Sequence, residues 1–358
     1  MTRQKDRTRL LSMLGTIVIC VSLAACGSDS GEPAAVDTQE PVEKLRIATA
    51  SFSIGHALTL LAADGGFFED FGLDVEVVNG QGAQNAVAAA VSGSVQAYAA
   101  PPVSVLAANI QTKLLMPVTV YAGLSNSLAL SEEAIANSGV AADAPVAERI
   151  RALDGLTIAS VAAGSSVTQS LNNIISTVEG VEVEYTYMQQ NTYVAAMASG
   201  AIDGFAGSSP FPQVAEAQGI GQVWLSGPAG EFPGYDESSI GIVMGFTEEF
   251  VRENPETAEK VVAAYLATAT FIEEEPEKAG DLLFESRFSD LEPEVWGQVW
   301  EGESQAFTRP VPDMKNAQVA LDEYKNSLQP GQPEANVDMS ELLASDLMAR
   351  ASERARGN

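Results

Sequence analysis

AAAVSGSVQAYA, at residues 88–99, returns later in the chain as AAMASGAIDGFA, at residues 195–206. In each copy an Ala-rich stretch that favours a helix ends at Ser-Gly and leads into a short apolar strand. The strands that open each half also correspond, because LRIA at 45–48 matches LTIA at 156–159. The repeat therefore predicts two similar lobes, each built from strands joined by helices.

Strands that are joined by helices favour an α/β fold with mostly parallel sheets, flanked by helices and connected by right-handed crossovers. After the second repeat the pattern gives one more strand, IGIVM at 240–244, and then an almost wholly helical extension. A strand that returns after the second repeat implies two crossings between lobes, which we expect near 121–130 and 234–240. We predict one lobe from 44–125 plus 240–330, a second lobe from 126–239, and a C-terminal helical tail over 331–358.

The N-terminus has the pattern of an export signal. Basic residues up to Arg9 precede an apolar run over 10–23, which is shorter than the roughly 20 residues of a membrane span. LAAC at 23–26 resembles the bacterial lipobox, in which the cysteine receives a lipid. We therefore predict a lipoprotein signal peptide over 1–25, a lipid on Cys26 and a flexible tether over 26–43; the alternative is an ordinary signal followed by an unmodified Cys26.

Composition excludes several functions. The chain has 19 Lys and Arg against 48 Asp and Glu, a net charge of −29, which excludes nucleic acid as a partner. Cys20 would leave with the signal, so the mature chain has no second cysteine for a disulfide. One histidine and no Gly-x-Ser-x-Gly argue against a zinc site and a serine hydrolase, and we expect neither enzyme activity nor a cofactor.

The assembled motifs resemble the solute-binding proteins of ABC importers for sulfonates, taurine, nitrate and pyrimidine precursors of thiamine. The motifs are Gly55-His56, GGFF at 65–68, FGLDV at 71–75, the repeat itself, and LDGLTIA at 153–159 leading to Gly164-Ser165-Ser166. The resemblance implies a type II periplasmic binding fold, hinge closure, and docking to permease subunits. We expect a monomer held at the outer face of the membrane, or in the periplasm, by its lipid. A pyrimidine-forming enzyme and a ligand-sensing lipoprotein without a transport role are the alternatives.

Candidate ligand residues lie in the turns that follow strands, where helix N-termini present free N–H groups. The strongest turn is 164–168, although a serine there can simply cap a helix, and the lone histidine can equally be structural. The candidates are Ser51, Phe52, Ser53, His56, Gln81, Gly82, Gln84, Tyr98, Gly164, Ser165, Ser166, Thr168, Gln189, Ser208, Ser209 and Tyr235.

Cations are missing from all of these turns, because no Lys or Arg occurs over 47–112 or over 152–251. A sulfonate or nitrate would lack a bidentate arginine unless a base such as Arg309 arrives from the helical extension. The gap favours a small polar or heteroaromatic solute, pyrimidine-like, held by aromatic rings and by amide and hydroxyl groups. A small anion remains the alternative.

Overall fold

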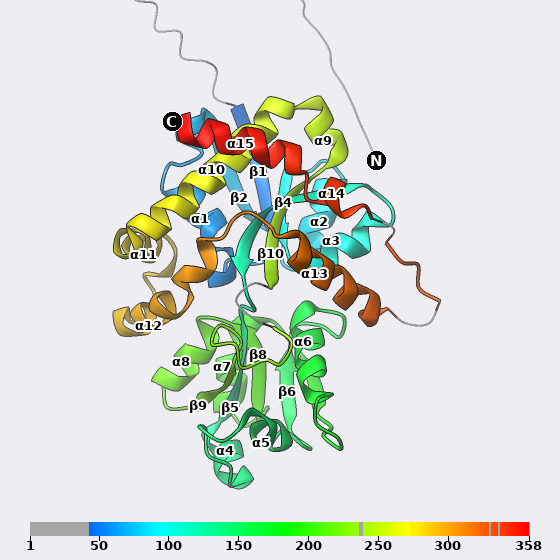
Figure 1. Cartoon of the computed structure of the whole chain (residues 1–358). Coiled ribbons are helices and arrows are strands. Elements are labelled where there is room, and N and C mark those ends of the chain that lie inside the picture. Colours follow the sequence, from blue (N-terminus) through cyan, green and yellow to red (C-terminus); the bar gives the residue numbers. More distant parts are fainter. Residues whose placement is uncertain (1–42, 236–238, 329–330, 336, 358) are drawn as a thin grey trace, which may run out of the picture. The chain divides into compact units, whose positions relative to one another are not determined.

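The computed structural model describes residues 43–235, 239–328, 331–335 and 337–357. The predicted signal peptide, the lipid-bearing Cys26 and the tether up to residue 42 lie outside the described residues. Two separate five-stranded sheets, each flanked by helices, make up the described part (Figure 1). The α/β fold class predicted from the repeat is confirmed.

The first sheet has the order β2-β1-β3-β10-β4. Its strands are β1 (Glu43–Thr49), β2 (Leu73–Asn79), β3 (Ala97–Ala100), β4 (Leu114–Ala122) and β10 (Ile240–Thr247). β1 pairs in parallel with β2 and β3, while β10 pairs antiparallel with β3 and β4. Four strands therefore run the same way, and β10 runs against them.

The second sheet repeats this arrangement in the order β7-β6-β8-β5-β9. Its strands are β5 (Asn126–Ser131), β6 (Thr157–Ser160), β7 (Glu184–Tyr187), β8 (Gly204–Ser208) and β9 (Gly221–Ser226). Here β5 is the strand that runs against the others. The two strands of the repeat, β3 and β8, hold the central position of their sheets.

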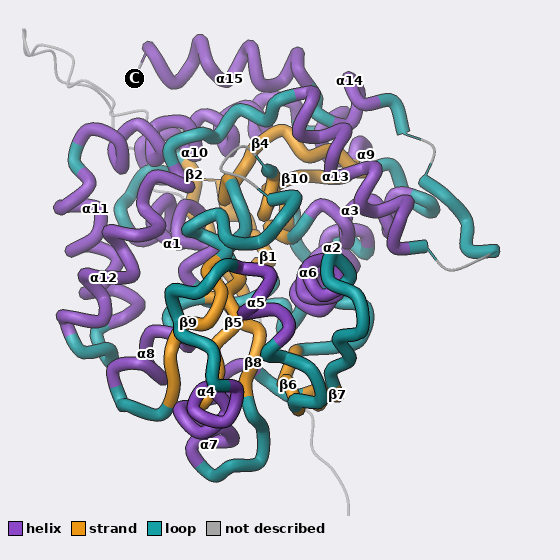
Figure 2. The backbone as a smooth tube through the Cα atoms, turned by 60° about the horizontal axis from the view of Figure 1, so that its bottom comes forward, coloured by secondary structure: helices purple, strands orange, loops and turns teal. Residues whose placement is uncertain are grey.

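Helices flank the strands of both sheets, as the purple and orange segments of Figure 2 show. They are α1 (Ala57–Asp64), α2 (Ala83–Val91), α3 (Pro102–Asn109), α4 (Glu132–Ser138), α5 (Val146–Arg151), α6 (Ser166–Ile175), α7 (Tyr193–Ala198), α8 (Phe211–Ala217), α9 (Glu248–Glu253), α10 (Pro255–Glu274), α11 (Pro276–Leu283), α12 (Pro293–Glu303), α13 (Met314–Ser327), α14 (Met339–Leu342) and α15 (Ser345–Gly357). In this part of the chain no helix is at once long enough and apolar enough to cross a membrane.

Each face of the first sheet has its own core because successive residues of a strand point to opposite faces. Ile47 packs with α1 and α10 residues on one face, whereas its neighbour Ala48 packs with α2, α3 and α13 residues on the other. The predicted C-terminal tail adds α15, whose Arg354 forms an ion pair with Glu259 of α10 at 2.7 Å. The helical extension thus encloses the first sheet.

Two segments connect the sheets, and each delivers the strand that runs against its neighbours. The chain leaves β4, turns over 123–125 and enters β5; it later leaves β9 and returns over 227–239 to β10. The Gly123 N–H donates to the Ser239 carbonyl at 2.6 Å, so the two crossings touch. A Cβ on Gly241 would lie 2.3 Å from the Gly123 carbonyl oxygen, so this close approach requires glycine.

Candidate functional site

The strand directions bring the predicted turns to facing edges of the two sheets. β4 ends where the first crossing begins, and β1, β2 and β3 run parallel to it, so their carboxyl ends share that edge. In the second sheet Asn126, at the start of β5, pairs with Ser208 at the end of β8, and β6 and β7 run parallel to β8. The turns that follow these strands therefore lie at the side where the chain crosses.

The turn after β1 presents an aromatic ring beside a hydroxyl pair. Ser51 Oγ and Ser53 Oγ lie 2.9 Å apart, and the Phe52 side chain is 38% exposed. The Arg287 guanidinium lies 5.4 Å from the centre of the Phe52 ring. Arg287 also donates to both carboxylate oxygens of Asp64 at 2.6 Å. A cation thus reaches this turn from the helical extension; the candidate named from the sequence was Arg309, not Arg287.

His56 follows the same turn and is buried, with a lowered pKa. The residue is 3% exposed, and neither ring nitrogen has a hydrogen-bond partner among the described residues. Burial lowers the pKa of His56 to about 4, although the nearby Ala99 carbonyl opposes part of that fall. The imidazole is therefore neutral at ordinary pH, with one donor and one acceptor enclosed beneath the turn.

The turn after β2 is linked to the turn after β1. Gln81 has a φ of 55° and donates its N–H to Asn79 Oδ1 at 2.8 Å, and the Gly82 N–H donates to the Ala50 carbonyl at 2.9 Å. The Gln81 and Gln84 side chains are exposed. Two glutamine amides are therefore free to face solvent at this edge.

Tyr98 does not face this edge as an aromatic wall. Its ring is fully buried in the core between the first sheet and α2, α3 and α13, and its hydroxyl donates to the Leu115 carbonyl at 2.7 Å. The reason is the pleat: Tyr98 lies within β3, with its side chain directed to a face of the sheet and not along it. Tyr98, predicted to contact a solute, is therefore a core residue.

In the second sheet, the turn after β6 caps α6. Ser165 Oγ accepts the Thr168 N–H at 3.2 Å, and the Thr168 hydroxyl lies 2.7 Å from both Ser160 Oγ and the Ala162 carbonyl. The capping role left open at the sequence level is therefore present for Ser165, and Thr168 is fully engaged. Gly164 is exposed and Ser166 half-buried.

The remaining candidates lie at the ends of β7 and β8 and in the second crossing. Gln189 is exposed, and the buried Ser208 hydroxyl donates to Asn126 Oδ1 at 3.1 Å. The Tyr235 hydroxyl accepts from Asn173 of α6 at 3.2 Å. Burial and the charge of Glu323, on α13, raise the pKa of Tyr235 to about 12. Tyr235 thus contacts elements that belong to different sheets.

A buried acid beside the first crossing was missed by sequence reasoning. Glu303, at the end of α12, is 2% exposed, and burial raises its pKa to about 7. The hydroxyls of Ser209 and Tyr121 lie near enough to oppose part of this rise, yet neither has the geometry of a hydrogen bond to the carboxylate. Ser209, predicted as a ligand residue, thus adjoins an acid that was not predicted.

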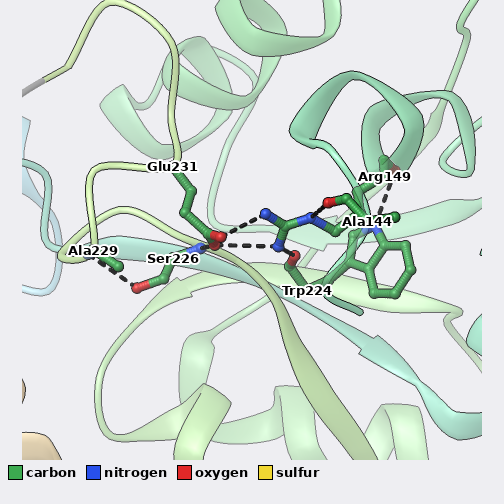
Figure 3. A network of polar contacts seen from close by, with 6 residues as sticks. All are labelled: Ala144, Arg149, Trp224, Ser226, Ala229 and Glu231. Carbon is green, nitrogen blue, oxygen red and sulfur yellow. Dashed lines mark hydrogen bonds and ion pairs between the residues drawn. The ribbon is translucent and has the colours of Figure 1, made fainter. Parts of the chain in front are cut away.

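A polar network fixes the start of the second crossing (Figure 3). The buried Arg149 guanidinium donates to the Ala144 and Trp224 carbonyls and forms an ion pair with Glu231. Burial raises the pKa of Glu231, but hydrogen bonds from Arg149 and from the Ser226 N–H outweigh burial and lower it overall. The network ties α5 and β9 to the loop where the chain leaves the second sheet.

Residues 38–283 match the NMT1-like family model. The structure is similar to that of the alkanesulfonate-binding protein SsuA from Xanthomonas axonopodis bound to MOPS, with a TM-score of 0.62, 17% identity, and coverage of 80% of this chain and 94% of that one. The structure is also similar to that of the periplasmic nitrate-binding protein NrtA from Synechocystis, with a TM-score of 0.64 and 15% identity. The match covers 88% of this chain and 89% of that one.

A Candida albicans protein described as having the generic periplasmic binding protein structural fold gives a TM-score of 0.58 at 11% identity, with coverage of 87% and 94%. No curated protein is significantly similar in sequence. These likenesses confirm the predicted periplasmic binding fold and the resemblance from which it was inferred.

Proposed function

The chain belongs to the NMT1-like family, and on that premise we propose that it is the solute-binding component of an ABC importer. The observation that carries this proposal is the pair of sheets whose strand ends meet at two touching crossings. Rotation about two crossings lets two lobes close on a solute with few broken contacts. Two proteins of this fold bind an alkanesulfonate and nitrate by name, which supports solute capture and delivery to permease subunits.

The solute we propose is a small polar or heteroaromatic molecule, pyrimidine-like. Phe52 offers an exposed ring face, while the exposed Gln81 and Gln84 amides offer donors and acceptors. The turns themselves contain no Lys or Arg. A small anion is the second candidate, and Arg287 favours it because its guanidinium stands over Phe52; its two hydrogen bonds to Asp64 weigh against it.

The same proposal places the protein outside the cytoplasmic membrane, held there by a lipid on Cys26. Its support is LAAC at 23–26 behind a basic and apolar N-terminus. The lipid would keep the solute-binding part close to the permease.

A thermal-shift screen tests the function. Pyrimidines, aromatic acids, sulfonates and nitrate are added to the purified protein, and a solute at one hundred times its Kd stabilises by about 2.7 kcal/mol. That gain corresponds to a rise in Tm of about 4 °C for a chain of this size. We expect a pyrimidine-like compound to give the largest rise.

Variants identify where the solute binds. Phe52→Ala should weaken binding, whereas Ser92→Ala, an exposed serine in the Ser-Gly turn of the first repeat, serves as the matched surface control. If no compound raises Tm, or if Phe52→Ala binds as well as the parent, the proposal is wrong.

A further inference from the structure

Glu303 carries a carboxylate that no described residue pairs with. Within the described part of the chain, neither Oε1 nor Oε2 has a hydrogen-bond partner, and the residue is 2% exposed. An ionised carboxylate in that position is costly, so it must take up a proton or meet a cation. Because the pKa is about 7, Glu303 can be protonated or ionised near neutral pH.

Among the described residues, the lining of the hollow beside Glu303 offers acceptors and a hydroxyl. Glu303 and Gln213 line one hollow of about 150 Å³, together with Ser226, Pro228, Ala229 and Val299 among others, and no Lys, Arg or His belongs to its lining in the described part of the chain. Gln213 Oε1 is buried and also lacks a hydrogen-bond partner. A set of unpartnered acceptors requires a guest that is rich in donors.

The hollow adjoins the proposed solute site. Ser209 directly follows β8 and is fully buried, and its Oγ is also unpartnered. It lies near Glu303, as does Tyr121 at the end of β4. The acid therefore lies where the strand ends and the first crossing meet, and a solute between the lobes can extend a group toward it.

We propose that this hollow is a subsite for an organic cationic nitrogen group, an ammonium or amidinium, with Glu303 as its counter-charge and the oxygen of Gln213 as a further acceptor. The inference rests on the proposed function, because it assigns the group to the imported solute. An ammonium offers up to three N–H donors, and an amidinium offers donors in a planar fork that matches a carboxylate.

The test uses salts of defined cations on the purified full-length protein at pH 8, at constant ionic strength. Acetamidinium, ethanolammonium, ammonium and potassium chlorides are compared by thermal shift and by calorimetry. We expect acetamidinium or ethanolammonium to raise Tm and potassium to leave it unchanged. Affinity should fall about tenfold per pH unit below 7, because the acid must be ionised to pair.

Glu303→Gln removes the charge and should weaken binding about ten- to hundredfold, the range of hydrogen bonds to charged groups. Glu301→Gln is the matched control, since Glu301 lies on the same helix and is exposed. Gln213→Lys is a second variant, which supplies an ammonium group covalently. At pH 8 its Tm should be higher than that of the parent, and added cations should no longer change it.

The inference and the proposed function can fail separately. If a solute from the screen binds the parent and Glu303→Gln equally, and no organic cation shifts Tm, the subsite is wrong and the function stands. If potassium acts as strongly as the organic cations, the hollow is an inorganic ion site and the proposal is overturned. If organic cations bind through Glu303 but the screen yields no solute, the subsite is supported and the proposed function is not.

Discussion

Replacing Glu303 with Gln should change how the stability of the protein depends on pH. The pKa of Glu303 rises from an ordinary value of 4.5 in the unfolded chain to about 7 in the folded protein. Between these values the folded state holds a proton that the unfolded state has lost. Stability from this group is therefore fully present below pH 4.5 and is lost as the pH rises through 7.

The displacement of this pKa corresponds to about 3 kcal/mol, because one pH unit is worth about 1.4 kcal/mol. Gln cannot ionise, so the Glu303→Gln protein should not lose this amount. The difference between variant and parent in free energy of unfolding should therefore grow by about 3 kcal/mol, in favour of the variant, from pH 5 to pH 8. Urea denaturation in amine-free buffers at several pH values measures it.

Glu301→Gln removes the same formal charge from an exposed position of α12 and should stay within about 0.5 kcal/mol of the parent throughout. A difference between Glu303→Gln and the parent that stays constant from pH 5 to pH 8 would refute the reasoning. It would mean that Glu303 is hydrated or paired, and both the buried acid and the subsite built on it would fall.

Further predictions address other parts of the molecule. The pKa of His56 is about 4 in the folded protein and 6.5 in the unfolded chain, so the parent loses stability as the pH falls from 6.5 to 4. His56→Gln cannot take up this proton, and urea denaturation at pH 4 should show that it avoids a loss of about 3 kcal/mol in the free energy of unfolding. Arg149→Ala leaves Glu231 unpaired and two carbonyls without their donor, and should lower the free energy of unfolding by about 3 kcal/mol; an unchanged urea midpoint would contradict it. Ser165→Ala should cost about 1 kcal/mol as a lost helix cap, whereas Ser166→Ala should leave Tm nearly unchanged and weaken solute binding, as measured by calorimetry. Cys26→Ser should move the protein from the membrane to the soluble fraction without changing its Tm, and membrane retention would count against lipidation.

The repeat predicted the fold because it is a local signal. LRIA at 45–48 lies within β1, and IGIVM at 240–244 lies within β10. The strand directions are tertiary facts that this pattern does not contain. β5 and β10 run against their neighbours because each enters its sheet from a crossing at the edge where the parallel strands end, so it must run back along them.

The candidate turns could be named from local sequence, whereas Glu303 approaches them from a distant helix. A signal for Glu303 existed: Trp296, Val299 and Trp300 form an apolar stripe on α12, and Glu303 follows at the spacing that places it on the same face. Among 48 acidic residues that single position is easily taken for surface. Its neighbours Tyr121 and Ser209 belong to two different sheets, and no local pattern connects them.

The charge of the bound solute and the protonation state of Glu303 depend on each other. A cationic solute draws Glu303 into its ionised form and binds better as the pH rises through 7, releasing a proton when it binds below that value. An anionic solute in the same place would be repelled by the carboxylate and bind better as the pH falls, with uptake of a proton. A neutral ring with one basic nitrogen differs from both, because it shares the proton that Glu303 already holds below pH 7 and takes up a proton when it binds above that value. The sign of the proton change on binding therefore separates the cationic from the anionic class of solute, even before the solute is identified chemically.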